Sequence, residues 1–206
     1  MKIVPANLDR IQAHDLFMSV IVPRPIAFVS TVGVDGVYNV APFSALASMG
    51  LKPPRVCFYT GLKQDGSKKD TLRNIEFSKG FVVNVVDESI VEAMNQASAE
   101  YPSDVDEFKE VGLTPVKSEL VKAPRVAESP VNMECKLVQI LTFGDDPIDG
   151  YLIIGEVVLV HIKDSLWAGN HVDTAKLKAI GRLGGRLYCH TTRTFELEQA
   201  IIRNTQ

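Results

Sequence analysis

Apolar residues in this chain gather mainly in short runs rich in β-branched and aromatic side chains, separated by turn-sized polar stretches. Runs of this kind are typical of β-strands. We predict strands at the following positions: 18–22, 24–32, 37–43, 55–60, 81–86, 131–143, 151–162 and 186–190. Helices are predicted at two places, about 68–78 and 90–99, and 170–180 is expected to hold one irregular turn. Consecutive strands with short connections favour a mainly β fold, an antiparallel barrel with two or three inserted helices, over alternating β and α units.

The connections between these segments carry their own signals. The runs 131–143 and 151–162 are separated by the turn sequence DDPIDG, which predicts a hairpin. The segment 46–54 is expected to be a connection, leading into a central strand at 55–60. The polar stretch 100–109, EYPSDVDEFK, is expected to be exposed and mobile.

Composition and charge narrow the class of protein. The chain has 206 residues, of which 46% are hydrophobic and 23% charged, as in ordinary folded domains. Nothing divides it, so we expect a single domain over residues 1–206. The formal net charge of −3 provides no basic field for nucleic acid. The N-terminal sequence MKIVPANLDRIQ does not resemble a signal peptide, and no apolar run approaches the roughly 20 residues of a membrane span. We therefore expect a cytoplasmic protein that binds neither nucleic acid nor membrane.

The cysteines and histidines give little sign of metal chemistry. Cys57, Cys135 and Cys189 lie far apart in strand-like runs, without a Cys-x-x-Cys spacing, and are expected to be buried reduced thiols. The four histidines occur singly, and no His-Glu-x-x-His motif is present. We expect no metal site.

The stretch 22–44, VPRPIAFVSTVGVDGVYNVAPFS, places small polar side chains inside two apolar strands. Such intrusions are what a barrel needs when one end holds a polar ligand. Ser30 and Thr31 should point to opposite faces, so both cannot reach one ligand unless a bulge re-aims one of them. Asn39 and Ser44 bind the same ligand or, equally, bond to neighbouring backbone. Pro42 frees nearby backbone groups from the strand ladder.

The start of the predicted helix at 68–78 has the composition of an anion site. Ser67 is expected to be its N-cap, with Asp70 completing a capping arrangement. Lys68, Lys69 and Thr71 add cations and a hydroxyl to the partial positive charge of a helix N-terminus, which suits a phosphate dianion. The alternative is a well-capped surface helix with solvated lysines.

Two other residues extend this candidate site. Asn74 lies one turn beyond Asp70 and Thr71, on much the same helix face, although a simple surface position is equally compatible with the pattern. Arg182 lies in the glycine-rich sequence GRLGG and can reach a phosphate or a carbonyl, or can be an ordinary turn arginine. That sequence is not the G-x-G-x-x-G fingerprint and precedes a strand, which argues against a dinucleotide-binding βαβ fold.

Taken together, the ordered motifs resemble those of flavin reductase-like proteins with an FMN-binding split barrel, in particular the branch that includes flavoredoxin. The resemblance covers about residues 18–188 and rests on these motifs: PRPIAFVST, NVAPFS, PPRVCFYTG, KDTLRNI followed by FVVNVV, SPVNMECKL and IIGEVVLVHI. It implies a homodimer of Greek-key-like split β-barrels that bind FMN near the dimer interface. It also implies a set of cofactor-binding residues: Ser30, Thr31, Asn39, Ala41, Phe43 and Ser44 for the ribityl chain and ring, Lys69, Asp70, Thr71 and Asn74 for the phosphate, and, with less support, Arg182.

The resemblance also implies an activity: transfer of electrons from NADH or NADPH through FMN to a flavin, a ferric complex or a redox protein. Several reductases of this family carry a histidine just before the strand that contains the GEV motif, whereas this chain has Asp149-Gly150-Tyr151 there. His161 follows the motif and is expected to be structural. The alternative is therefore an FMN-binding electron carrier that does not itself react with NAD(P)H.

Overall fold

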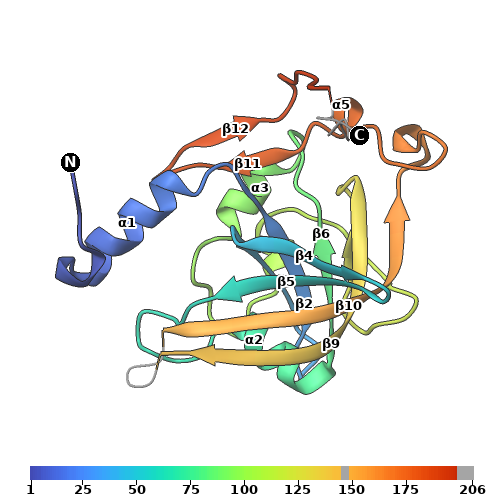
Figure 1. Cartoon of the computed structure of the whole chain (residues 1–206). Helices are drawn as coiled ribbons and strands as arrows, with labels where there is room; N and C mark the ends of the chain where they lie inside the picture. The colour runs from blue at the N-terminus through green and yellow to red at the C-terminus, as the bar shows by residue number, and fades with distance from the viewer. Residues whose placement is uncertain (145–148, 199–206) are drawn as a thin grey trace.

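The computed structural model describes residues 1–144 and 149–198 (Figure 1). Its strands are β1 (Arg24–Pro25), β2 (Ala27–Val32), β3 (Tyr38–Phe43), β4 (Leu46–Leu51), β5 (Pro54–Thr60), β6 (Gly80–Asn84), β7 (Pro115–Val116), β8 (Arg125–Val126), β9 (Val131–Phe143), β10 (Gly150–Ile162), β11 (Ile180–Arg182) and β12 (Tyr188–His190). Its helices are α1 (Arg10–Val20), α2 (Asp70–Ser78), α3 (Val91–Gln96), α4 (Glu107–Glu110) and α5 (Thr174–Leu177), with 3-10 turns η1 (Pro5–Asn7) and η2 (Asp164–Leu166).

Seven strands form one antiparallel sheet in the order β3-β2-β6-β9-β10-β5-β4. The ends of this row, β3 and β4, follow one another in the chain, so the sheet curls back on itself without closing. The predicted hairpin is confirmed, with β10 paired to β9 from Gly150↔Phe143 to Ile162↔Val131. Part of the turn sequence between them, residues 145–148, lies outside the described residues.

Two predictions in the first half of the sheet were wrong. The segment 46–54 is not a connection, because β4 pairs with β5 from Leu46↔Phe58 to Leu51↔Pro54. As a result β5 is not central but second from the end of the row. The strand β4 escaped detection because it is exposed along almost its whole length and shows no apolar alternation.

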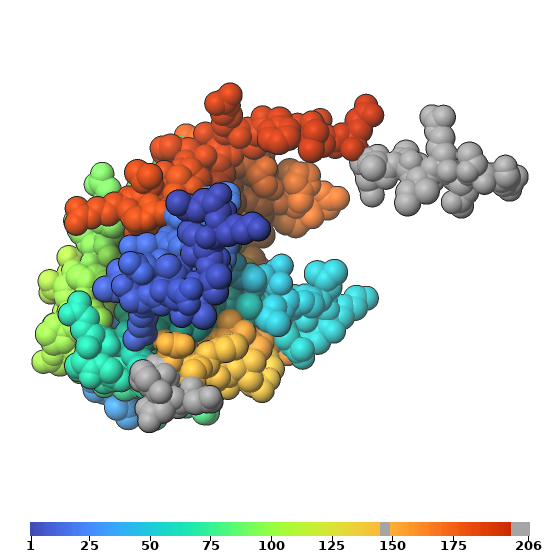
Figure 2. All heavy atoms as spheres, turned by 60° about the vertical axis from the view of Figure 1, so that its left-hand side comes forward, coloured from blue at the N-terminus to red at the C-terminus, as the bar shows by residue number. Residues whose placement is uncertain are grey.

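The predicted strand at 18–22 is also wrong, because residues 18–20 form the end of α1 and Ile21 is its C-cap. A capping box fixes the start of this helix: Gln12 N donates to the Asp9 side chain at 2.8 Å, and the Gln12 side chain accepts from Asp9 N at 3.3 Å. No residue of α1 is buried. The helix projects from the strands in Figure 1 and lies on the surface in Figure 2.

The two faces of β2 lie in two different apolar cores. Ala27 and Val29 pack on one side with α2 and the inner residues of the sheet, including Phe58 and Phe81. Ile26 and Phe28 pack on the other side, with residues from α3 and α4. Successive side chains of β2 therefore pack alternately into the two cores, as the two-residue period of a strand requires.

The stretch 100–109 was predicted to be exposed and mobile, and this is wrong for its last part. It runs into α4, where Glu107 is 6% exposed and Phe108 is fully buried. Phe108 meets the ring of Tyr38 edge-on, with ring centroids 6.0 Å apart. The apolar side chain draws this otherwise polar segment onto β3.

The predicted helix at 68–78 starts later than expected. Ser67 is not the N-cap, because α2 begins at Asp70 after Lys69, which makes no side-chain capping bond. Instead, Ser67 N donates to the Asp65 carboxylate at 2.8 Å in the preceding loop. The first backbone N–H groups of α2 are therefore left without a capping side chain from the described residues.

The three cysteines are all free. Cys57 and Cys135 are buried as predicted, whereas Cys189 is half-buried. Burial raises the pKa of the Cys135 thiol to about 12, so this thiol is unreactive near neutral pH. Among the helices of the described residues, none combines the length and apolar character needed to cross a bilayer.

Candidate functional site

Three adjoining hollows follow β3 from the β2–β3 turn to its C-terminal end. The first, of about 480 Å³, is bounded by that turn, by α2 and by residues 102–107. The second is nearly filled, at about 50 Å³, and shares Asn39, Asp70 and Glu107 with the first. The third, of about 280 Å³, continues past Pro42 and Ser44 to Arg182. We call this continuous depression the β3 groove.

Four of the predicted residues meet in one hydrogen-bond network beside the groove. Asn39 Oδ1 accepts from the Thr31 hydroxyl at 3.0 Å and from the Thr71 hydroxyl at 2.8 Å. Asn74 Nδ2 donates to Thr31 Oγ1 at 3.0 Å. Residues from β2, β3 and α2 are thus joined, as expected from the shared helix face and the strand pairing Thr31↔Asn39.

Glu107 completes this network from α4. Its Oε2 accepts from Asn39 Nδ2 at 2.5 Å and from the backbone N–H of Val40 at 2.6 Å. Burial raises the pKa of Glu107 to about 7, although both hydrogen bonds and the charges of Lys63 and Lys69 oppose that rise. A carboxyl group that changes charge near neutral pH therefore lies inside the groove.

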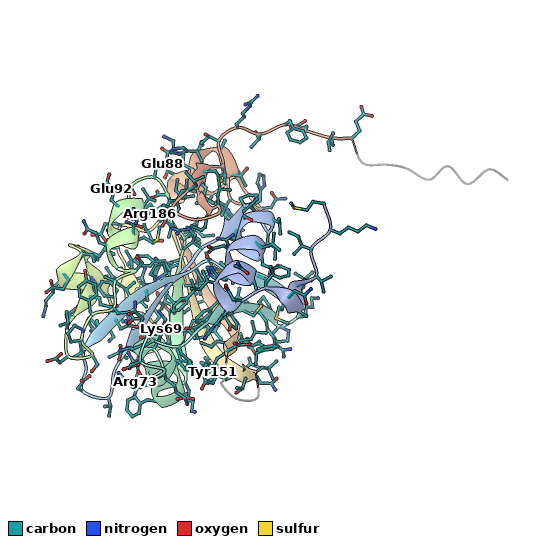
Figure 3. The ribbon with its side chains drawn as sticks, turned by 90° about the vertical axis from the view of Figure 1, so that its left-hand side faces the viewer. Lys69, Arg73, Glu88, Glu92, Tyr151 and Arg186 are labelled. Carbon is teal, nitrogen blue, oxygen red and sulfur yellow. The ribbon has the colours of Figure 1, made fainter. Side chains whose placement is uncertain are left out.

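Cationic side chains surround the start of α2. Asp70 holds Lys63 at 2.6 Å, in a pair whose side chains are 18% and 15% exposed, and it also pairs with Arg73. Lys69 lies 3.9 Å from Glu100. Figure 3 places Lys69 and Arg73 together, away from Glu88, Glu92 and Arg186 at the opposite end. Lys69 and the uncapped helix start, with Lys63 and Arg73 beside them, together favour a phosphate group.

The C-terminal part of β3 provides an apolar surface next to this polar end. Ala41 is half-buried and borders the second hollow together with Phe43. The Phe43 ring is anchored against Phe58, with centroids 5.0 Å apart. Ser44 borders the third hollow. The groove thus places the apolar side chains of Ala41 and Phe43 next to the cations at the start of α2, an arrangement suited to a phosphorylated planar ligand.

Two of the predicted site residues, Ser30 and Arg182, lie apart from both the network and the start of α2. Ser30 points to the other face of β2, as period two requires, where its hydroxyl donates to the Pro124 carbonyl at 2.5 Å. Arg182 borders the third hollow, stacks on the Tyr188 ring at 4.4 Å and donates to Gly185 O at 2.5 Å. Neither lies with Lys69, Thr71 and Asn39.

Among the groove residues that sequence reasoning missed are Lys63, Arg73 and Glu107. Lys63 lies in a loop whose path was not predictable, and Arg73 resembles any helix-surface cation. Glu107 had a usable signal, because Phe108, Val111 and Leu113 form an apolar series within an otherwise polar segment. That series indicates a segment that packs onto the core, and the packing of Phe108 brings its neighbour Glu107 to β3.

Comparison with known proteins places the chain in a family. A sequence model described as the flavin reductase like domain matches residues 18–176. An uncharacterized protein of Halalkalibacterium halodurans is 39% identical over 205 residues, covering 98% of this chain and 98% of that protein.

Two solved structures share both sequence and fold. Nitrilotriacetate monooxygenase component B from Bacillus cereus is 35% identical with a TM-score of 0.92, covering 96% of this chain and 98% of that chain. The 2-nitrobenzoate 2-nitroreductase of Pseudomonas fluorescens is 32% identical with a TM-score of 0.88, covering 97% and 96%.

Flavoredoxin of Desulfovibrio vulgaris, at 21% identity and a TM-score of 0.73 over 100% of this chain and 98% of that chain, shares the fold. The mainly β, antiparallel split-barrel fold predicted from the sequence is thereby confirmed. The chain belongs to the flavin reductase-like family, whose solved members include oxidoreductases.

Proposed function

We propose that the chain is an FMN-dependent oxidoreductase of the flavin reductase type, which moves electrons from NADH or NADPH through FMN to a flavin, a ferric complex or a protein acceptor. The observation that carries this proposal is the β3 groove, where the cations at the start of α2 adjoin the apolar side chains of Ala41 and Phe43. Membership of the flavin reductase-like family supports the same activity.

The donors of the groove fit FMN in the following way. Lys69, Thr71 and the start of α2 bind the phosphate. The amide groups of Asn39 and Asn74 line the path of the ribityl chain, and the buried Thr31 hydroxyl supports both from behind. The ring lies along residues 41–44, where Pro42 has no N–H of its own. Asp70 holds Lys63 and Arg73 in place. Ser30 and Arg182 lie outside this arrangement.

The protein residues bind and orient the cofactor and do not act as acid or base. FMN, when bound, supplies hydride acceptance and onward electron transfer, which need no side-chain acid or base. Phe43 and Tyr101 border the second hollow and keep water from the ring face. Donors and cations along the groove stabilise negative charge on the ligand.

The alternative is an electron carrier with the same cofactor. In the segment where related reductases carry a histidine, this chain has Gly150, and a Cβ added there would lie 2.4 Å from the Tyr59 hydroxyl and 2.5 Å from the Thr60 carbonyl oxygen. His161 does not replace that histidine, since its Nε2 lies 2.7 Å from the buried Glu134 carboxylate. This observation keeps a carrier without NAD(P)H reactivity as the second candidate.

An anaerobic titration separates the two candidates. Purified protein reconstituted with FMN is mixed with NADH or NADPH in the absence of oxygen, with free FMN as the control. We expect bleaching of the bound flavin by one of the nucleotides, faster than that of free FMN. Bleaching by a reduced ferredoxin-like donor but by neither nucleotide would establish the carrier instead. Protein that neither takes up nor releases flavin would reject both.

A double variant tests the position of the phosphate. Lys69→Ala with Thr71→Ala should weaken FMN by about a hundredfold and riboflavin by much less, because charge-assisted bonds to the phosphate are lost. Lys68→Ala is the matched control, since Lys68 pairs with Glu76 at 2.7 Å and lies over the Tyr151 ring instead. Equal losses for FMN and riboflavin would contradict this position.

We also propose that the protein is a homodimer. Large apolar side chains remain exposed on α1, β4, β9 and β10, among them Ile11, Val20, Leu51, Val138, Phe143 and Val160. Exposed apolar side chains on an unpartnered helix and on the end strand β4 are what a subunit interface would cover. Sedimentation equilibrium should give twice the mass of one chain, and a monomer at micromolar concentration would refute the dimer.

A further inference from the structure

Glu107 has no role in the proposed function, yet its geometry is unusual. Its neighbour Phe108 is buried in the core on the Ser30 face of the sheet. The Glu107 carboxylate instead passes round the open edge of β3 and bonds the Asn39 side chain, which belongs to the Thr31 face. The four-residue helix α4 therefore makes contacts on both faces of the end strand β3.

The bond from Glu107 decides which way the Asn39 amide points. Oε2 of Glu107 already accepts from the Val40 backbone N–H, so it is an acceptor whether or not the other carboxyl oxygen carries a proton, and the Asn39 group that faces it must be the NH₂. The amide oxygen then faces the other way, toward the hydroxyls of Thr31 and Thr71, 3.0 and 2.8 Å distant. Without Glu107 the amide could turn over, and both hydroxyls would lose their acceptor.

We propose that Glu107 is a positioning residue of the flavin site. It fixes the Asn39 amide and, through the hydroxyl that Thr71 donates to Asn39, holds the first turn of α2 where its uncapped backbone N–H groups receive the flavin phosphate. This inference rests on the proposed function. Glu107 acts through Asn39 and need not touch the reacting atoms of the cofactor.

The charges around Glu107 make its ionisation sensitive to the ligand. The groups that border the same hollows are Lys63, Asp35, Lys69, Asp70, Arg73, Glu100 and Tyr101, and Asp106 precedes Glu107 in the chain. Lys63 and Lys69 stabilise the carboxylate. A phosphate dianion at Lys69 offsets that attraction and adds repulsion, so binding raises the pKa of Glu107 further. FMN binding therefore takes up a proton, and affinity falls as pH rises through about 7.

The test compares three variants by FMN and riboflavin affinity, measured from quenching of flavin fluorescence. Glu107→Ala should weaken FMN by about tenfold or more and riboflavin by less than about threefold, because the first turn of α2, which loses its tie to Asn39, serves the phosphate that riboflavin lacks. Glu107→Gln keeps a carbonyl that accepts both bonds, and should restore FMN affinity to within about threefold of the original. Glu110→Ala removes an exposed carboxylate from the same helix and should change neither.

The pH profile provides a readout that a purely structural role would not affect. Above pH 7 the affinity of the original protein for FMN should fall, while Glu107→Gln should show no such fall and riboflavin should show none in either protein. Identical profiles for the two proteins would overturn the proposal, as would a Glu107→Gln variant no better than a folded Glu107→Ala. If Glu107→Ala does not fold, Glu107→Gln and its profile still decide. Failure of the original protein to bind flavin would instead overturn the proposed function, and this inference with it.

Discussion

Ser30 and Thr31 are neighbours in the chain, fully buried, and each belongs to a different polar network. On the Ser30 face the centre is Asn84, whose NH₂ donates to Phe28 O at 2.9 Å and to Ser30 Oγ at 3.0 Å. Its amide oxygen accepts from Val126 N at 3.0 Å and from Asn132 Nδ2 at 2.9 Å. On the Thr31 face the centre is Asn39, and its partners are side chains.

The difference between the two networks lies in their partners. The Asn84 network ends on backbone groups of β2 and β8 and on the Pro124 carbonyl, so it ties the segment before β9 to the sheet. The Asn39 network borders a hollow and is surrounded by ionisable groups. Similar amides and hydroxyls thus support the fold on one face and a ligand site on the other.

The largest expected effect comes from breaking the Asn84 network. Asn84→Ala removes four hydrogen bonds and leaves several buried groups without partners, which should lower the free energy of unfolding by about 4 kcal/mol. FMN affinity of the folded fraction should stay within about twofold. Urea unfolding measures the first and fluorescence titration the second, with the exposed Asn170→Ala as control. A large loss of affinity at unchanged stability would mean that the two networks are not separate in role.

The pH dependence of stability gives the next effect. The folded pKa of Glu107, about 7, lies above its ordinary value of 4.5. The folded protein then binds more protons than the unfolded chain between these values, so the free energy of unfolding falls as pH rises from 4.5 to 7, by up to about 3 kcal/mol. The difference in stability between the original protein and Glu107→Gln, followed by urea unfolding across this range, should show that fall. A constant difference would show that Glu107 ionises normally.

The neighbouring pair provides the sharpest contrast at a smaller magnitude. Thr31→Val removes a hydroxyl beside the groove and should weaken FMN by about tenfold, or about 1.4 kcal/mol. Ser30→Ala removes a hydroxyl of similar burial and should lower the free energy of unfolding by about 1 to 2 kcal/mol without affecting FMN. FMN affinity and the free energy of unfolding are measured for both variants. A loss of affinity in Ser30→Ala, with a loss of stability alone in Thr31→Val, would place the ligand on the Ser30 face.

The smallest effect needs no substitution. Raising the salt concentration from about 0.05 M to about 0.5 M should weaken FMN binding by a few-fold, because counterions screen the cations at the start of α2. Riboflavin, which lacks the phosphate, should be almost insensitive. A salt response of equal size for both ligands would contradict an electrostatic attraction between the flavin phosphate and the cations at the start of α2.

The division between Ser30 and Thr31 was predictable because strand periodicity is local. The meeting of Thr31, Asn39, Thr71 and Asn74 was expected only in part, from one helix face and from the family resemblance. Glu107 lies 68 residues from Asn39 in the chain, and its approach depends on where Phe108 packs. Contacts of that kind arise from tertiary packing and leave no periodic trace.

The missed elements have similar physical reasons. The strand β4 is exposed and contains Ser48 and Gly50, so neither burial nor alternation marks it. The helix α1 buries nothing in this chain, and its one clear signal was the Asp9-Gln12 capping pair. Elements that face solvent or a partner subunit carry weak apolar patterns, whereas the β9–β10 hairpin, half-buried and alternating, was located almost to the residue.

The open edge of β3 has a consequence for solubility during expression and storage. An end strand with free N–H groups can recruit a strand from another molecule and start aggregation. Here the Val40 N–H is already bonded to Glu107, and Pro42 has no N–H to offer. Strand addition is therefore blocked at the two successive outward positions, Val40 and Pro42. This edge can border a ligand groove without promoting aggregation.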